Sequence, residues 1–243
     1  MRSLSASQML AAWERGVPQG PTERALTLLA ANHSEDSPDD LAKLSVGRRD
    51  ARLLTLREQT FGSRLVGLAT CPGCVELLEL AFDIADMRAP DVPEPGTLAV
   101  QVEGYEVEFR LPDSFDLRSI AGSQDISASR DVLLQRCLLH IRRNGETLTA
   151  SDLPDLVIAA ITARMAQVDP QANVQLALTC PLCSHEWQAP FDVVSFFWSE
   201  INNWAHRILH DVHTLATAYG WHEVDILALS STRRQVYLDL VNR

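Results

Sequence analysis

The sequence lacks a long hydrophobic run. Among its 243 residues, no stretch reaches the roughly 18 apolar residues that a membrane-spanning helix needs. Residues 1–5 are not followed by an apolar segment, so we expect no secretory leader. We therefore expect a cytoplasmic protein whose cysteines stay reduced.

Positive charge is also scarce. Lysine and arginine together number 21 against 32 aspartates and glutamates, which gives a net charge of −11. Broad binding of nucleic-acid phosphates requires a basic surface, so this balance argues against a nucleic-acid partner. A hydrophobic content of 46% is normal for a globular chain that buries a core. The composition suits a soluble protein that contacts other proteins.

Motifs of the common enzymes are missing. The sequence contains no phosphate-binding glycine loop, no Gly-Xaa-Ser-Xaa-Gly elbow and no cysteine–histidine pair in a catalytic context. His206, His210 and His213 share one face of a predicted helix, but Arg207 stands where a zinc protease has glutamate. We interpret these histidines as surface or partner-facing residues and predict no catalytic residue.

The chain does contain two pairs of closely spaced cysteines. Each pair places two thiols one tight turn apart, so that both sulfurs can bind the same ion. Four thiolates form a closed tetrahedral shell, which is the usual form of a structural zinc site. We predict one structural Zn²⁺, with iron as a less favoured alternative. The two motifs that supply the ligands are Cys71-Pro72-Gly73-Cys74 and Cys180-Pro181-Leu182-Cys183.

The residues around the two cysteine pairs repeat. An offset of 109 residues maps Cys71 onto Cys180, and it also maps Phe82-Asp83 onto Phe191-Asp192. Each copy consists of an apolar strand, a thiol turn and a second strand. Two such hairpins that face each other would form a zinc ribbon, whose halves lie far apart in the sequence.

Paired thiols also occur in disulfides and in redox enzymes. Disulfides would require an oxidising compartment, and a thioredoxin-like motif would place one pair at the start of a helix. Rubredoxin-like iron sites usually have glycine after the second cysteine of a turn, whereas Val75 and Ser184 stand there. The fifth cysteine, Cys137, lies in an apolar segment and is predicted to be a buried small hydrophobe. A dithiol redox protein and a zinc-ribbon nucleic-acid-binding or regulatory protein remain the alternative hypotheses.

Helical signals dominate the N-terminal region. Candidate N-caps are Ser5 or Ser7 for the first helix and Ser37 and Ser45 for later ones, and Gly62 would end the last of these helices. The last helix carries four arginines that could bind phosphate. We favour a solvated helix face that pairs with Asp50 and Glu58. The four arginines are Arg48, Arg49, Arg52 and Arg57.

The segment between the ribbon halves mixes strand and helix signals. Residues 98–111 alternate between apolar and polar and predict a β-hairpin that turns at Glu103-Gly104. A helix is predicted over residues 127–143, ended by Asn144-Gly145, and a further helix precedes the second thiol turn. Apolar residues spaced by three and four then predict a long helix over 195–219, with Gly220 at its C-cap.

The predicted fold class is therefore α+β. We expect a largely helical chain with a four-cysteine zinc ribbon, built from two distant hairpins, and an inserted β-hairpin plus helices. The expected regions are an N-terminal helical region over 1–62, ribbon halves at 63–86 and 172–194, an insertion over 87–171, and a C-terminal helical region over 195–243.

Aromatic residues are concentrated near the C-terminus. Tryptophan and tyrosine are enriched at the centres of protein interfaces, so part of this group would bind a partner. We predict four partner-binding residues, Trp198, Trp204, Tyr219 and Trp221.

Short patterns along the chain give a resemblance to a known family. Together with the thiol turns, they resemble the small cysteine-pair proteins encoded in contractile phage tail and injection-system clusters. Those proteins are described as T-even-type baseplate hub assembly chaperones or baseplate proteins. The resemblance covers nearly the whole chain, and roughly the last 50 residues are its most specific part. The patterns are Trp13-Glu14, Arg24-Ala25-Leu26, Gly47-Arg48-Arg49-Asp50, Phe61-Gly62, Glu200-Ile201, Asp211-Val212-His213, Ala218-Tyr219-Gly220-Trp221, Ile226-Leu227, Arg233-Arg234 and Tyr237.

This resemblance implies a role without catalysis. The protein would help to assemble the baseplate of a contractile injection machine or would belong to it. The implied partners are baseplate hub or wedge proteins, contacted by the aromatic-rich helical end. Neither a nucleic-acid partner nor a membrane span is expected.

Overall fold

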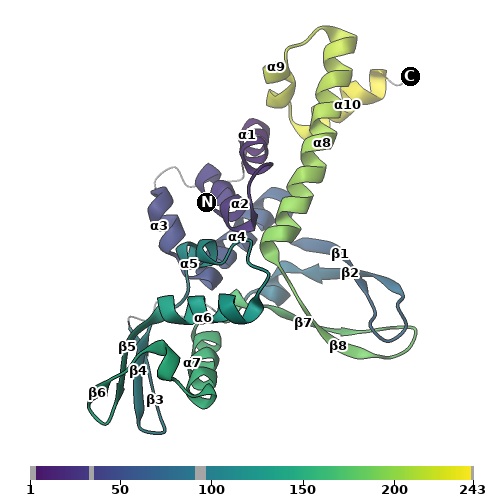
Figure 1. The fold of residues 1–243 in the computed structure, drawn as a ribbon. Coiled ribbons are helices and arrows are strands. Elements are labelled where there is room, and N and C mark those ends of the chain that lie inside the picture. The colour runs from purple at the N-terminus through teal and green to yellow at the C-terminus, as the bar shows by residue number, and fades with distance from the viewer. Residues whose placement is uncertain (1–3, 33–35, 91–96, 242–243) are drawn as a thin grey trace.

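The computed structural model describes residues 4–32, 36–90 and 97–241. Its fold is α+β, as the sequence predicts. A helical body lies at the centre, and pairs of strands and helices extend from it in different directions (Figure 1).

Four helices form the N-terminal part of the body. Ser5 and Gln8 form a capping box at the first helix, and the hydroxyls of Ser37 and Ser45 accept backbone N–H bonds at the third and fourth. Gly62, at φ 88°, ends the fourth helix in a conformation that favours glycine. The predicted caps are therefore confirmed. The helices are α1 (Ala6–Gly16), α2 (Pro21–Asn32), α3 (Pro38–Lys43) and α4 (Val46–Phe61).

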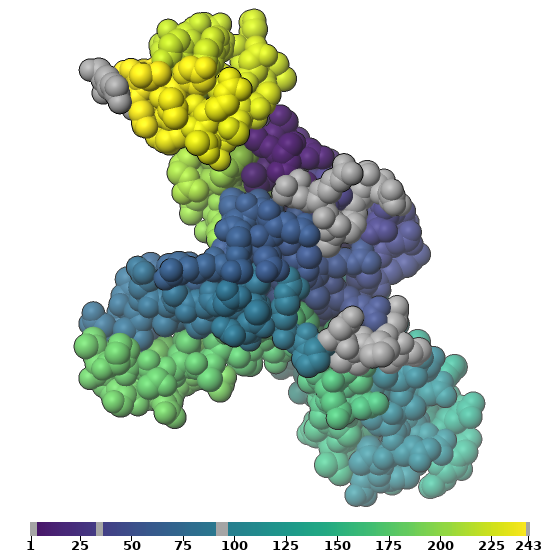
Figure 2. Space-filling view, turned by 180° about the vertical axis from the view of Figure 1, so that it is seen from behind, coloured from purple at the N-terminus to yellow at the C-terminus, as the bar shows by residue number. Residues whose placement is uncertain are grey.

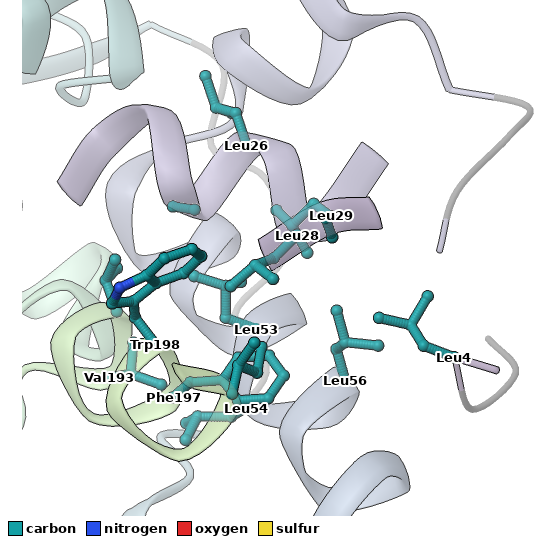
Figure 3. Packing of buried hydrophobic residues seen from close by; sticks show 14 of the residues in the cluster. Leu4, Leu26, Leu28, Leu29, Leu53, Leu54, Leu56, Val193, Phe197 and Trp198 are labelled. Carbon is teal, nitrogen blue, oxygen red and sulfur yellow. The ribbon is translucent and has the colours of Figure 1, made fainter. Parts of the chain in front are cut away.

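The main core lies where α2 and α4 meet the start of the long helix α8 (Val193–Tyr219). Leu28, Leu29, Leu53 and Phe197 are completely buried there (Figure 3). Each such side chain contributes roughly 2 kcal/mol by leaving water. The core thus joins the two ends of the chain.

An ion pair fastens α4 to α8 beside this core. Arg57 is 2% exposed, and its Nε donates to a carboxylate oxygen of Glu200 at 2.8 Å. A second guanidinium nitrogen contacts the other carboxylate oxygen at 2.5 Å, and the third donates to the Gly62 carbonyl at 2.7 Å. Two-point pairing of this kind fixes both distance and angle between the partners.

Two β-hairpins leave the body together (Figures 1 and 2). Each forms an antiparallel two-stranded sheet of its own, with a predicted thiol turn at its tip. At their bases, the buried Gln171 donates to the Met87 carbonyl at 3.2 Å and accepts from the Ala89 N–H at 2.7 Å. The elements are β1 (Arg64–Thr70), β2 (Leu77–Asp83) and η1 (Ile84–Met87) in the first half, and η3 (Pro170–Ala172), β7 (Gln175–Thr179) and β8 (Glu186–Pro190) in the second.

A four-stranded antiparallel sheet lies between these halves in the sequence. Its strand order is β3-β4-β5-β6, and its buried face packs on α7 (Asp155–Val168) through Phe109, Ile141 and Ile161. Glu103-Gly104, at φ 53° and 78°, forms the predicted turn between β3 and β4. The strands are β3 (Leu98–Val102), β4 (Tyr105–Phe109), β5 (Leu138–Arg143) and β6 (Glu146–Thr147), and the 3₁₀ turn η2 (Ala150–Asp152) follows them.

The helix predicted over residues 127–143 is wrong from Leu138 onward. The helix α6 covers Ile126–Cys137, and the chain then continues as strand β5, which pairs with β4. Asn144-Gly145, at φ 51° and 86°, is the turn of a β-hairpin and does not end a helix. The expected inserted β-hairpin is consequently part of a larger sheet.

A buried carboxylate joins this sheet to the helices beside it. Asp116 is completely buried in α5 (Ser114–Ser119) and contacts Arg110 at 2.6 Å and Arg136 at 2.8 Å. Burial alone would raise the pKa of Asp116, but hydrogen bonds from Arg110, the Asp113 N–H and Arg136 outweigh burial and lower it to about 2. The carboxylate therefore stays ionised in the fold.

The C-terminal helices form an arm that extends from the body (Figure 1). Gly220, at φ 69°, caps α8 in the left-handed conformation, as predicted. The helices α9 (Glu223–Ala228) and α10 (Ser231–Val241) fold back on α8 and share a second core with it. Across the described ranges, no helix combines the length and apolar character that crossing a bilayer requires.

Candidate metal centre

The two thiol turns have the same backbone geometry. The Cys71 N–H donates to the Glu76 carbonyl and the Val75 N–H to the Cys71 carbonyl, both at 2.9 Å. The second turn has the equivalent bonds: the Cys180 N–H donates to the His185 carbonyl and the Ser184 N–H to the Cys180 carbonyl, both at 2.9 Å. The 109-residue sequence repeat is thus also a structural repeat.

The two turns bring all four predicted ligands together. The Sγ atoms of Cys71 and Cys183 lie 3.7 Å apart, those of Cys74 and Cys180 lie 3.6 Å apart, and all four lie within 4.8 Å of one another. A tetrahedral Zn²⁺ with Zn–S bonds of about 2.3 Å requires sulfurs about 3.8 Å apart. The cluster therefore fits one metal ion held within a single chain.

The thiols of the cluster differ in pKa when no metal is bound. The N–H groups of Cys183 and Leu182 face the sulfur of Cys180 and lower its pKa to about 7. The N–H of Glu76 favours the Cys74 thiolate, but desolvation and the neighbouring sulfurs outweigh it and raise the pKa of Cys74 to about 12. Without a cation the cluster retains protons, whereas a bound divalent ion would stabilise all four thiolates.

The comparison with protein families gives a match over most of the chain. The model of a family described as T4 bacteriophage base plate protein matches residues 8–198. The chain belongs to this family. Membership supports a structural or assembly role in a phage baseplate. No curated protein and no solved structure matches the chain.

The matched region differs from the expected one in one respect. It contains both thiol turns and ends at residue 198. The C-terminal residues, which were expected to be the most specific part of the resemblance, lie outside it. Family membership therefore rests on the body, the hairpins and the sheet.

His185 packs beside the cluster. Its ring stacks on Trp187 with ring centres 6.1 Å apart, and a Cβ added to Gly73 would lie 3.0 Å from its Cγ. Gly73 thus allows the second hairpin to approach the first turn closely. Among the described residues, the group of possible metal ligands consists of the four cysteines, and His185 forms part of the surrounding wall.

Cys137 is separate from this cluster. It is 2% exposed, and burial raises its pKa to about 11. The thiol therefore stays protonated, which confirms the prediction of a buried small hydrophobe.

The arginines of α4 differ from the prediction. Arg49 and Arg57 are 4% and 2% exposed, so the expectation of a solvated face is wrong for them. Arg49 does pair with Asp50 at 2.8 Å, but Glu58 pairs with Arg88 at 2.6 Å. Arg57 thus joins α4 to α8 through Glu200, whereas Arg49 is buried beside Asp50 of its own helix.

The four predicted partner-binding residues lie in different environments. Trp198 is 8% exposed and belongs to the main core, with the Arg24 guanidinium 4.5 Å from its ring centre. Trp204 is partly buried between the two cores. Tyr219 is 39% exposed at the end of α8, and its ring stacks on Trp221 with ring centres 4.8 Å apart.

Tyr237 completes an aromatic cluster that sequence reasoning did not select. Its ring centre lies 5.9 Å from that of Tyr219 and 4.8 Å from that of Trp221, with edge-to-face geometry in both pairs. Tyr237 comes from α10, and its spacing along the chain carries no signal of this contact. We call Tyr219, Trp221 and Tyr237 the arm cluster.

Proposed function

We propose that this protein is a non-enzymatic assembly chaperone or minor structural component of the baseplate of a phage tail or contractile injection system. The cluster of four cysteines carries the proposal, because it joins two distant hairpins within a chain of the T4 base plate family. Reduced thiols suit the cytoplasm, where we place assembly of the protein into its particle.

We propose structural zinc as the occupant of the cluster. Cys71, Cys74, Cys180 and Cys183 would fill all four positions of a tetrahedral ion, so no position is left for water or substrate. Zinc is favoured over iron because Val75 and Ser184 replace the glycines usual in rubredoxin-like turns. The role of the ion would be to stabilise the fold.

The zinc would act on residues far apart in the sequence. Cys74 and Cys180 are separated by 106 residues, and the four-stranded sheet lies between them. Ligands from both hairpins meet only in the folded state, so the free energy of metal binding adds to the free energy of folding. Binding would thereby hold the two hairpins in one arrangement for a partner.

We propose that the arm docks on a baseplate hub or wedge protein. Tyr219 and Trp221 are the two predicted partner-binding residues that belong to the arm cluster, and we propose that they contact the partner. Trp204 lies on α8 nearer the body and supports the arm. Stacked aromatic rings with partial exposure are typical of interface centres. Trp198 packs in the core and is left out of this docking surface.

Particle assembly with arm variants tests this docking. Tyr219→Ala/Trp221→Ala should abolish incorporation of the protein into particles, or the particles themselves, while the purified variant keeps its metal and its circular dichroism. Val224→Ala is the matched control, because Val224 is 69% exposed on α9 and lies outside the arm cluster. Normal particles made with the double variant would contradict docking through the arm.

A further inference from the structure

The outer face of the first hairpin is unusually apolar. Val66 and Leu68 on β1 and Leu77 on β2 are 49%, 68% and 60% exposed. The strand register places Val66 opposite Ala81, Leu68 opposite Glu79 and Thr70 opposite Leu77, so these side chains lie on one face of the sheet. We call Val66, Leu68 and Leu77 the apolar stripe.

The second hairpin shows that the fold does not require this stripe. At the 109-residue offset, Gln175, Ala177 and Glu186 occupy the positions of Val66, Leu68 and Leu77. These positions are also exposed, in the same antiparallel register. Equivalent exposed positions therefore carry polar or small residues in the second hairpin and large apolar residues in the first. A structural repeat that folds with polar residues on this face implies that the apolar residues serve binding.

The dimensions of the face indicate the kind of occupant. Two strands of seven residues span about 23 Å by 10 Å. This footprint of about 230 Å² is far below the roughly 800 Å² per partner of a stable interface, so the face alone does not support a dimer of this chain. An α-helix is about 10 Å wide, and one of about 15 residues would cover the length of the face.

The charges on this face indicate which charged residues the partner helix would carry. Glu79 lies within the apolar stripe, directly opposite Leu68, and Asp83 lies at its base opposite Arg64. Glu76 is exposed beside the thiol turn. Acidic groups thus outnumber basic ones on and around the stripe, which favours a partner with lysine or arginine beside its apolar residues.

We propose that the outer face of the β1–β2 hairpin binds an amphipathic helix of another protein, whose apolar side covers Val66, Leu68 and Leu77 and whose basic residue pairs with Glu79. The face is accessible because the hairpins project from the body (Figure 2). This surface is separate from the arm cluster, so its test does not depend on docking through the arm.

NMR titration of the zinc-loaded full-length chain tests this proposal. The probe is a short amphipathic peptide of leucine and lysine at helical spacing, compared with a counterpart in which glutamate replaces lysine. The lysine peptide should shift resonances of β1 and β2 and bind about tenfold or more tightly than the glutamate peptide. Equal affinity of the two peptides, or shifts confined to other elements, would overturn the proposal.

The second hairpin supplies the variants for this test. Val66→Gln/Leu68→Ala/Leu77→Glu introduces the residues found at equivalent positions, and it should weaken binding of the lysine peptide about tenfold or more while zinc content is unchanged. Gln175→Ala/Gln188→Ala on the outer face of the second hairpin is the matched control and should leave binding unchanged. Unchanged binding by the triple variant would overturn the assignment. Concentration-dependent dimers that the triple variant abolishes would also overturn it, since a second copy would then be the occupant.

Discussion

Replacing Val75 with glycine is expected to stabilise the metal-loaded protein. Val75 follows the first thiol turn at φ 63°, a left-handed conformation that suits a β-branched residue poorly. This conformation costs a non-glycine residue about 1–2 kcal/mol, whereas the extra freedom of glycine in the unfolded chain costs about 0.5–1 kcal/mol. Because Val75 is 76% exposed, its truncation loses little buried surface. The expected net gain in the free energy of unfolding is about 0.5–1 kcal/mol.

Urea denaturation of the zinc-loaded variants measures this gain. Leu182→Gly is the control, because Leu182 is 68% exposed in the second thiol turn and is not among the described residues with positive φ. Glycine there should destabilise by about 0.5–1 kcal/mol. Ser184 has φ 57°, so Ser184→Gly should also raise the free energy of unfolding. The gain should be smaller than for Val75→Gly, because serine is not β-branched. A loss of stability in Val75→Gly as large as that in Leu182→Gly would refute the reasoning.

Three further perturbations test the body, the sheet and the metal. Glu200→Gln should lower the free energy of unfolding by about 3 kcal/mol, because Arg57 would remain buried without its counter-charge. Urea denaturation measures this loss, and an unchanged free energy of unfolding would contradict the prediction. Asp116 has a folded pKa of about 2, below its usual 3.8, so the stability it contributes is present above pH 4 and is lost as the pH falls toward 2. Asp116→Asn should reduce this acid dependence by up to about 2 kcal/mol in pH-dependent unfolding, and an unchanged acid profile would argue against the assignment. A chelator should lower the melting temperature by about 10 °C or more, and zinc, but not magnesium, should restore it in calorimetry. An unchanged melting temperature after chelator treatment would exclude a stabilising ion.

Local signals predicted much of this fold. A serine before a helix or a glycine after it acts within one turn of backbone, so the caps at Ser5, Ser37 and Gly62 could be assigned from the sequence. The two hairpins with thiol turns were predictable because the same motif occurs twice, and four paired thiols suggest a shared metal site.

Other features depended on contacts that the sequence does not display. Leu134, Cys137 and Ile141 have helical spacing, which predicts a helix through Ile141. The chain nevertheless becomes a strand at Leu138, because it pairs with β4 and then turns at Asn144-Gly145 into β6. The Arg57–Glu200 pair joins residues 143 positions apart, and no local pattern indicates it. Aromatic density near the C-terminus likewise could not separate the buried Trp198 from the exposed Tyr219, because burial is decided by the packing of distant helices.

The most direct test of the account is native mass spectrometry of the intact protein, purified without chelator, combined with metal analysis. We predict that each chain carries one zinc ion, which is lost when either hairpin loses both of its cysteines. The predicted ligands are Cys71, Cys74, Cys180 and Cys183. A metal-free chain with two intrachain disulfides, or with four freely reactive thiols, would contradict it.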